Sequence, residues 1–320
     1  MLYSILKVWV RIAAFIFCRK IIINNRVLLK EKGPLLLACN HPNSFLDAVI
    51  LDILFEEPVW SLARGDAFSG KTIIKILTAV KILPVYRTSE GVENLGENYK
   101  TFDACLDIFR NNGVVQIFSE GKCINEWHLR TLKKGTARLA FSCYENNIPI
   151  KVLPVAINYN SFKKFGKNIF ISFGKIITKD DLDMSNGDGL RNQQFNNLLK
   201  AELEKFVFEI DKTDLAKKKK LLEIKIPVWE KIVLFPFAVI GFLVHAPLYA
   251  PVKAFVHKKT FLTDHYDSVL ITILLIAYPI YLLLITLIVF AFIKSWWVFL
   301  LLLILPFMAW CYVRVKGQVD

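Results

Sequence analysis

The sequence has 320 residues, which suffices for one large domain or for a medium domain with appendages. Hydrophobic residues make up 54% of it, more than soluble domains usually carry, and 41 Lys and Arg against 28 Asp and Glu give a formal net charge of +13. This balance favours contact with anionic lipid surfaces or acidic small substrates, and no nucleic-acid-binding signature accompanies it. The six cysteines form no Cys-x-x-Cys pair, so we expect reduced thiols in a protein facing the cytosol and no zinc site.

Residues 1–20 are predicted to form an apolar helix that lies in the membrane interface. Lys7 and Arg11 are four positions apart and share one helical face, whereas most apolar side chains fall elsewhere. These charges and the lack of a small-x-small cleavage site argue against a secretory signal peptide. A buried N-terminal helix is the alternative.

Residues 21–213 alternate β-branched runs with amphipathic stretches, which predicts an α/β domain with a mostly parallel sheet flanked by helices. We expect strands at residues 34–39, 59–63, 82–86, 114–118, 150–157 and 168–173. We expect a helix that has Pro42 in its first turn and runs through residue 54, further helices at residues 72–80, 99–110 and 134–144, and a closing helix over residues 195–210. In such sheets, ligands bind outside the carboxyl ends of the strands.

The remaining sequence resembles lipid-facing protein. Residues 214–267 form a basic and apolar segment, in which residues 232–250 contain two prolines, so we prefer a re-entrant or interfacial segment there to a third membrane span. Residues 268–293 and 296–313 carry no charged side chain, which predicts a transmembrane helical hairpin within residues 268–320. The basic residues on both flanks place the main domain on the cytoplasmic face.

A candidate catalytic pair lies in the segment CNHPNSFLDA, residues 39–48. His41 follows a predicted strand, and the side chain of Asp47, about one and a half turns into the next helix, would lean back toward it. An Asp–His hydrogen bond fixes the imidazole tautomer and leaves the other ring nitrogen as a general base for a hydroxyl. On this segment alone, a His41 that caps the helix and an Asp47 that faces solvent are an equal alternative.

Two further segments place charged groups at the same edge of the sheet. Arg87 ends one predicted strand, and its planar guanidinium suits a phosphate. Glu120, Gly121 and Lys122 follow another strand, and the glycine would let the backbone approach an anion closely. For Glu120, a contact with substrate and backbone hydrogen bonds within its own loop are equal alternatives. A general base beside phosphate-binding groups predicts an enzyme that deprotonates a hydroxyl of a phosphorylated polyol.

Four ordered blocks within roughly residues 30–160 resemble the glycerolipid acyltransferase family. The blocks contain His41, Arg87, Glu120 and Pro154. The resemblance implies that His41 is the general base, that Asp47 orients it, that Arg87 lies near the phosphate, and that Glu120 and Gly121 belong to the site.

Two positions depart from the family pattern. Five residues rather than four separate His41 from Asp47, and Cys123 stands where the family usually has an arginine. The phosphate contact of that arginine would then fall to another cation, namely Lys122, Arg130 or Lys133. Both departures favour the variant that acylates glycerol 3-phosphate.

The resemblance therefore implies a membrane acyltransferase that moves a fatty acyl group from an acyl thioester to a hydroxyl of glycerol 3-phosphate, in phospholipid biosynthesis. Acyl-CoA or acyl-carrier protein would be the cosubstrate, with no bound cofactor, metal or nucleic acid. One alternative acceptor is 1-acylglycerol 3-phosphate or another lysophospholipid, and a further alternative is a non-catalytic, lipid-binding membrane scaffold. His245, His257 and His265 lie in or near the lipid-like sequence and are interpreted as ordinary interfacial residues.

Overall fold

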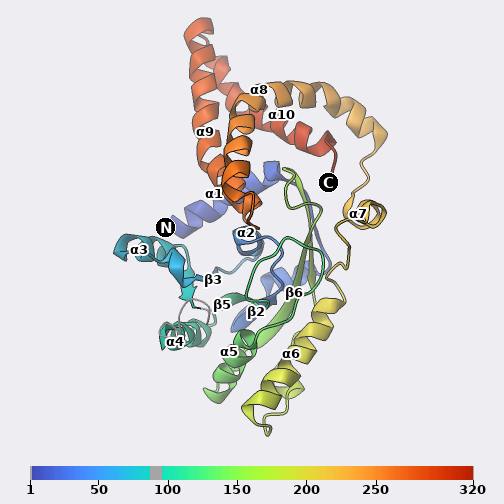
Figure 1. The fold of residues 1–320 in the computed structure, drawn as a ribbon. Coiled ribbons are helices and arrows are strands. Elements are labelled where there is room, and N and C mark those ends of the chain that lie inside the picture. Colours follow the sequence, from blue (N-terminus) through green and yellow to red (C-terminus); the bar gives the residue numbers. More distant parts are fainter. Residues whose placement is uncertain (1, 87–95, 320) are drawn as a thin grey trace.

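A computed structural model describes residues 2–86 and 96–319 of the chain (Figure 1). The described residues include seven strands in one sheet, in the order β1-β7-β6-β2-β5-β3-β4. Neighbouring strands are parallel except for β6 and β7. The strands are β1 (Cys18–Ile23), β2 (Leu35–Cys39), β3 (Val59–Arg64), β4 (Ile82–Val85), β5 (Val114–Phe118), β6 (Lys151–Tyr159) and β7 (Lys167–Phe173). The predicted, mostly parallel sheet is thus confirmed.

Helices cover both faces of this sheet, as predicted. They are α1 (Leu2–Phe17), α2 (Phe45–Leu54), α3 (Lys71–Ala79), α4 (Glu97–Arg110), α5 (Lys134–Glu145), α6 (Asp188–Glu204) and α7 (Leu215–Leu222). Three long apolar helices follow, α8 (Val228–Thr260), α9 (Tyr266–Ile293) and α10 (Leu301–Val315).

The central strand β2 separates two hydrophobic clusters. Leu36 and Ala38 point to the face that α4, α5 and α6 cover, and Leu35, Leu37 and Cys39 point to the face on which α1 and α2 pack. Side chains alternate across a strand, so β2 contributes to both clusters. All five of its residues are fully buried, as expected for a parallel strand between two helical layers.

The structure corrects the N-terminal boundary. The helix predicted over residues 1–20 ends at Phe17, and Cys18–Ile23 forms the edge strand β1, parallel to β7. The apolar sequence continues without a turn signal from the helix into the strand, so hydrophobicity alone could not separate them.

Helix α1 faces the domain with its charged side. Lys7 Nζ donates to Glu57 O at 3.2 Å, and Arg11 Nε donates to Ile53 O at 2.7 Å. The apolar side chains on the other side are exposed: Leu2, Ile5, Leu6, Val8, Trp9, Ile12 and Phe15. The alternative of a buried N-terminal helix is therefore wrong, and an outward apolar face suits a membrane interface.

The C-terminal part contains three apolar helices rather than the two predicted. By length and composition, α8, α9 and the segment Trp296–Val315 could each cross a membrane. Residues 232–250, expected to be re-entrant or interfacial, belong to one continuous helix of 33 residues that includes Pro236 and Pro247. Such prolines are tolerated in apolar helices where neighbouring helices and local adjustments satisfy the freed carbonyl groups.

Helix α8 is a bent arch whose two ends lie beside the α/β domain (Figure 1). Near its start, Glu230 pairs with Arg314 at 2.6 Å, and Arg314 also donates to Arg19 O in β1. Just after its end, Asp264 Oδ1 accepts from the N–H of Asn125, which follows β5. Helix α9 then leaves the domain and α10 returns along α8. In Figure 1, α1, α8, α9 and α10 gather at one end of the molecule, and α4, α5 and α6 lie at the other.

Candidate active site

The site begins at the carboxyl end of β2, in the β2–α2 loop (residues 40–44). Asn40 ties this loop to the neighbouring strand β6, because its side chain donates to Ile157 O at 3.0 Å and accepts from Ile157 N at 2.8 Å. The loop therefore starts from a fixed point at the edge of the sheet.

The structure brings His41 and Asp47 together. With the proton on Nδ1, His41 donates to Asp47 Oδ2 at 2.8 Å, and the same oxygen accepts from the N–H of Asn43 at 2.8 Å. The Asp47 side chain is fully buried, so the alternative in which it faces solvent is wrong, whereas 14% of the His41 side chain is exposed. Within the described residues, no hydrogen bond engages His41 Nε2, so this nitrogen can accept a proton.

Phe118, at the end of β5, supports the imidazole ring. The two ring centroids are 4.0 Å apart and the rings are stacked at 16°. With Asp47 at Nδ1 and Phe118 under its plane, the ring has one defined orientation.

Ser44 accommodates the extra residue between His41 and Asp47. Its φ of 52° is uncommon for a residue with a side chain, and α2 begins at the next residue, Phe45, rather than at Pro42 as expected. Its N–H donates to Cys123 Sγ at 2.9 Å, and its hydroxyl lies 2.7 Å from His265 Nδ1. The five-residue spacing is therefore compatible with the His–Asp hydrogen bond.

Cys123 is a buried bridge rather than a surface group. Its Sγ accepts from the N–H of Ser44 and donates to Asp264 O at 3.8 Å. Burial, followed by the Asp47 charge, raises the pKa of this thiol, which therefore stays protonated at neutral pH. Cys123, which stands where the family usually has an arginine, thus connects three segments: the β2–α2 loop, the loop after β5 and the α8–α9 connection.

Both carboxylate oxygens of Glu120 accept hydrogen bonds from the backbone. Oε2 accepts from the N–H of His41 at 3.2 Å, and Oε1 accepts from the N–H of Arg130 at 3.1 Å. Burial raises the pKa of this carboxyl, and the two N–H groups oppose that shift by stabilising the carboxylate. Of the two roles considered for Glu120, this geometry favours the scaffold.

A group of cations surrounds the turn after Glu120. Gly121 has a φ of 69°, and a Cβ there would lie 3.0 Å from Lys133 Cγ, so the turn requires glycine. Arg130 Nη1 donates to Lys122 O at 3.0 Å. The side chains of Lys122 and Lys133 are exposed and form no ion pair with any carboxylate that the structure describes.

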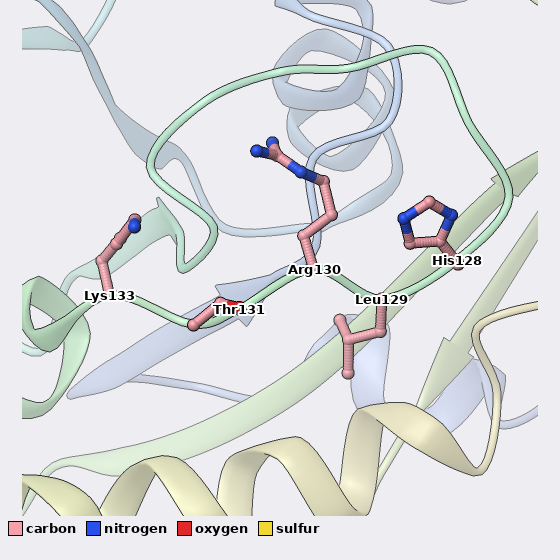
Figure 2. A pocket seen from close by; sticks show the side chains of 5 residues that line it. All are labelled: His128, Leu129, Arg130, Thr131 and Lys133. Carbon is pink, nitrogen blue, oxygen red and sulfur yellow. The ribbon is translucent and has the colours of Figure 1, made fainter.

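Arg130 and Lys133 also line an open pocket of about 370 Å³ with His128, Leu129 and Thr131. Figure 2 shows that the two cationic side chains extend to the same side of the backbone. Because Glu120 binds the backbone of both His41 and Arg130, this pocket lies close to the catalytic pair.

Arg87 lies outside the described residues, so its place at the site stays a prediction. The last described residue before it, Tyr86, packs against Gly65 at the end of β3, where a Cβ would lie 2.0 Å from the tyrosine ring. This contact brings the ends of β3 and β4 together.

Several residues that hold the site were not predicted from the sequence, namely Asn43, Asn125, Lys167, Asp267 and Ser268. Asn43 lies within residues 39–48, but its position relative to His41 and Asp47 matches no known motif spacing. Asp267 directly precedes a long uncharged run, which is the one signal that could have drawn attention to it. Lys167 lies just before a predicted strand, where a buried charge gives no pattern in the sequence.

A family model matches the part of the chain that carries the catalytic pair. Residues 20–158 match the family model described as Acyltransferase. The match spans less than half of the chain, includes His41, Asp47 and Glu120, and supports acyl transfer as the activity of this domain. No curated protein matches the chain.

Among solved structures, the chain is similar to the 1-acyl-sn-glycerophosphate (LPA) acyltransferase PlsC from Thermotoga maritima. The two sequences are 12% identical, the alignment covers 67% of this chain and 78% of the other, and the TM-score is 0.46.

Proposed function

We propose that this protein is a membrane O-acyltransferase that transfers a fatty acyl group from an acyl thioester to a hydroxyl of glycerol 3-phosphate. The observation that carries the proposal is the 2.8 Å hydrogen bond between His41 and the fully buried Asp47. It lies at the carboxyl end of β2, within the residues that match the acyltransferase family model.

In the proposed reaction, His41 acts as the general base. Asp47 holds the proton on Nδ1, so Nε2 takes the proton of the acceptor hydroxyl while its oxygen attacks the thioester carbonyl. The new C–O bond forms, the C–S bond breaks, and the thiolate leaves with the proton that His41 received. The Asp47 carboxylate stabilises the imidazolium between these steps. The reaction as proposed uses acyl-CoA or acyl-carrier protein as cosubstrate and no bound cofactor.

We assign the acceptor phosphate to the cations around Gly121. Lys122, Arg130 and Lys133 extend from one short segment beside the catalytic pair. Arginine and lysine both bind phosphate, and a fixed phosphate would hold the hydroxyl in line with Nε2. From the sequence, Arg87 is the further candidate for this contact.

The location of the site suits a lipid product. The exposed apolar face of α1 and the helices α8, α9 and α10 lie at one end of the molecule, and the base of α9 contacts the β2–α2 loop (Figure 1). We place this end in the membrane and, from the basic flanks of the hairpin, the α/β domain on the cytoplasmic face. An acyl chain could then reach the site from the bilayer.

An acceptor panel tests the proposal. Purified full-length protein in phospholipid nanodiscs is incubated with labelled palmitoyl-CoA, or with palmitoyl-carrier protein, and each of three acceptors: glycerol 3-phosphate, 1-acylglycerol 3-phosphate and glycerol. We expect transfer to glycerol 3-phosphate, and none to glycerol, because glycerol lacks the phosphate that the cations bind.

Each other outcome corrects a different part of the proposal. Transfer to 1-acylglycerol 3-phosphate alone would replace the preferred acceptor with the lysophospholipid alternative. No transfer to any acceptor from either donor would overturn the proposed function and favour the lipid-binding scaffold.

A further inference from the structure

The base of α9 closes over the loop that carries the catalytic pair. Ser268 Oγ accepts from the N–H of Leu46 at 3.2 Å and donates to Asn43 O at 3.4 Å. His265 Nδ1 lies 2.7 Å from the hydroxyl of Ser44. A segment more than 200 positions away in sequence therefore contacts residues between His41 and Asp47.

A fully buried ion pair lies directly beneath these contacts. Lys167 Nζ is 2.5 Å from Asp267 Oδ2, and neither side chain is exposed. Lys167 also donates to Ser161 O at 2.6 Å. The desolvation of two buried charges costs free energy that an apolar contact of the same size would not, so this pair is not needed merely to attach the helix to the sheet.

Asn43 connects this ion pair to the catalytic aspartate. Its side-chain Nδ2 donates to Asp267 Oδ2 at 2.9 Å, and its backbone N–H donates to Asp47 Oδ2 at 2.8 Å. A continuous chain of polar contacts thus runs from Lys167 through Asp267, Asn43 and Asp47 to His41. Apart from His41, its members are almost completely buried.

We propose that Asp267, which pairs with Lys167, is a positioning residue for catalysis: its side-chain oxygen acts through Asn43 to fix the Asp47 carboxylate and hence the direction of His41 Nε2. This inference rests on the proposed function. Lys167 and Asp267 both lie outside residues 20–158, so the matched domain alone lacks this support. The helix proposed to enter the membrane is then also part of the catalytic architecture.

The magnitude expected follows from geometry. A displacement of about 1 Å in a catalytic group can reduce the rate by roughly 10²-fold without weakening substrate binding. Loss of the Asp267–Asn43 bond should therefore lower kcat and leave KM nearly unchanged.

Two double variants test this proposal while avoiding an unpaired buried charge. Lys167→Met/Asp267→Asn removes both charges but keeps an oxygen that accepts from Asn43 Nδ2. Lys167→Met/Asp267→Leu removes both charges and that acceptor. We expect the first variant to retain kcat within about threefold, and the second to lose roughly 10- to 100-fold in kcat, with KM for both substrates within about threefold.

A matched control removes an ion pair near the start of α8. Glu230→Leu/Arg314→Met deletes this pair between α8 and α10, and no hydrogen bond or ion pair among the described residues joins it to the β2–α2 loop. Its kcat should stay at the wild-type value. Thermal unfolding of all variants in the same nanodiscs shows whether each remains folded.

A spectroscopic readout separates this proposal from the proposed function. The Nδ1 proton of His41, bound to a buried carboxylate, should give a downfield proton resonance that His41→Ala lacks. We expect this resonance to persist in the Asn variant and to shift or broaden in the Leu variant. Equal kcat and an unchanged resonance in both variants would overturn the positioning role, whether or not the acceptor has been identified correctly.

Discussion

At the scale of single residues, the site depends on buried side chains that fit between particular backbone groups. Cys123 is the clearest case, because its sulfur lies between the N–H of Ser44 and the carbonyl of Asp264, and only 7% of the residue is exposed. The family resemblance would put an arginine at this position, and an arginine side chain is much larger than the buried thiol that stands there.

We therefore predict that Cys123→Arg, which restores the usual family residue, abolishes acyl transfer. The larger guanidinium side chain would displace the β2–α2 loop from its contact with position 123, at a cost of about 1–3 kcal/mol. Cys123→Ser keeps a donor and an acceptor and should retain most of the activity. An active Cys123→Arg would mean that the side chain can reach the phosphate site after all.

Glu120 allows a second prediction at this scale. Its two oxygens accept from two backbone N–H groups, whereas a glutamine has one acceptor and would direct an NH₂ group at the other donor. Glu120→Gln should lower the free energy of unfolding by about 1–3 kcal/mol and reduce kcat. Thermal unfolding and rate measurements beside Glu145→Gln, an exposed control, check this, and an unchanged Glu120→Gln would refute the scaffold role.

At the scale of elements, most of the helices and strands of the α/β domain could be predicted from hydrophobic patterning. The short apolar runs of β2, β5 and β6 lie between turn signals, so their ends were nearly right. Strand β1 was not predicted, because it follows α1 directly without a turn. Helix α8 was underestimated because prolines usually end helices in water, whereas here they lie among other apolar helices.

The site was predictable where its residues are neighbours in sequence or follow neighbouring strands. The side chain of Asp47, in the helix after His41, leans back toward it, and Glu120 follows β5, which pairs with β2. The contacts of Asn43 with Asp267, and of Asp267 with Lys167, join distant segments through buried charges. No periodicity in the sequence carries that information.

The end of α10 provides a prediction about pH. Burial, together with the nearby charges of Arg19, Lys167, Lys164 and Lys253, lowers the pKa of Lys316 to about 7. Between about pH 7 and the ordinary value of 10.5, the unfolded chain binds a proton that the folded chain does not, so stability rises with pH in this window and is lost as pH falls through it.

Lys316→Met should flatten this rise, and the exposed control Lys212→Met should not. The melting temperature in detergent, measured at intervals from pH 7 to pH 9, gives the comparison. If Lys316→Met keeps the wild-type slope, Lys316 is charged in the folded protein across this range.

At the scale of the whole molecule, the account requires a membrane on one side of the α/β domain. Helix α9 has 28 residues and a length of about 42 Å, enough to cross a hydrocarbon core of about 30 Å. It ends at Ile293, and Lys294 and the exposed Trp296 and Trp297 follow it. Such a tip, with tryptophans beside a lysine, suits the far membrane interface.

Cysteine labelling in sealed vesicles tests this arrangement. The six native cysteines are buried, so the background should be low. We expect Lys294→Cys to react with a membrane-impermeant maleimide only from the face opposite to the one that labels Lys200→Cys, on α6 of the domain. Labelling of both positions from the same face would show that α9 and α10 do not cross the membrane.

The central claim is that His41 is the general base of an acyl transfer. The most direct measurement compares wild-type protein with His41→Ala and Asp47→Asn in nanodiscs, using palmitoyl-CoA and glycerol 3-phosphate, with equal folding verified by thermal unfolding. The account predicts a loss of at least about 10²-fold in kcat for His41→Ala and a large loss for Asp47→Asn, with little change in KM. A folded His41→Ala protein that transfers acyl groups at the wild-type rate would contradict it.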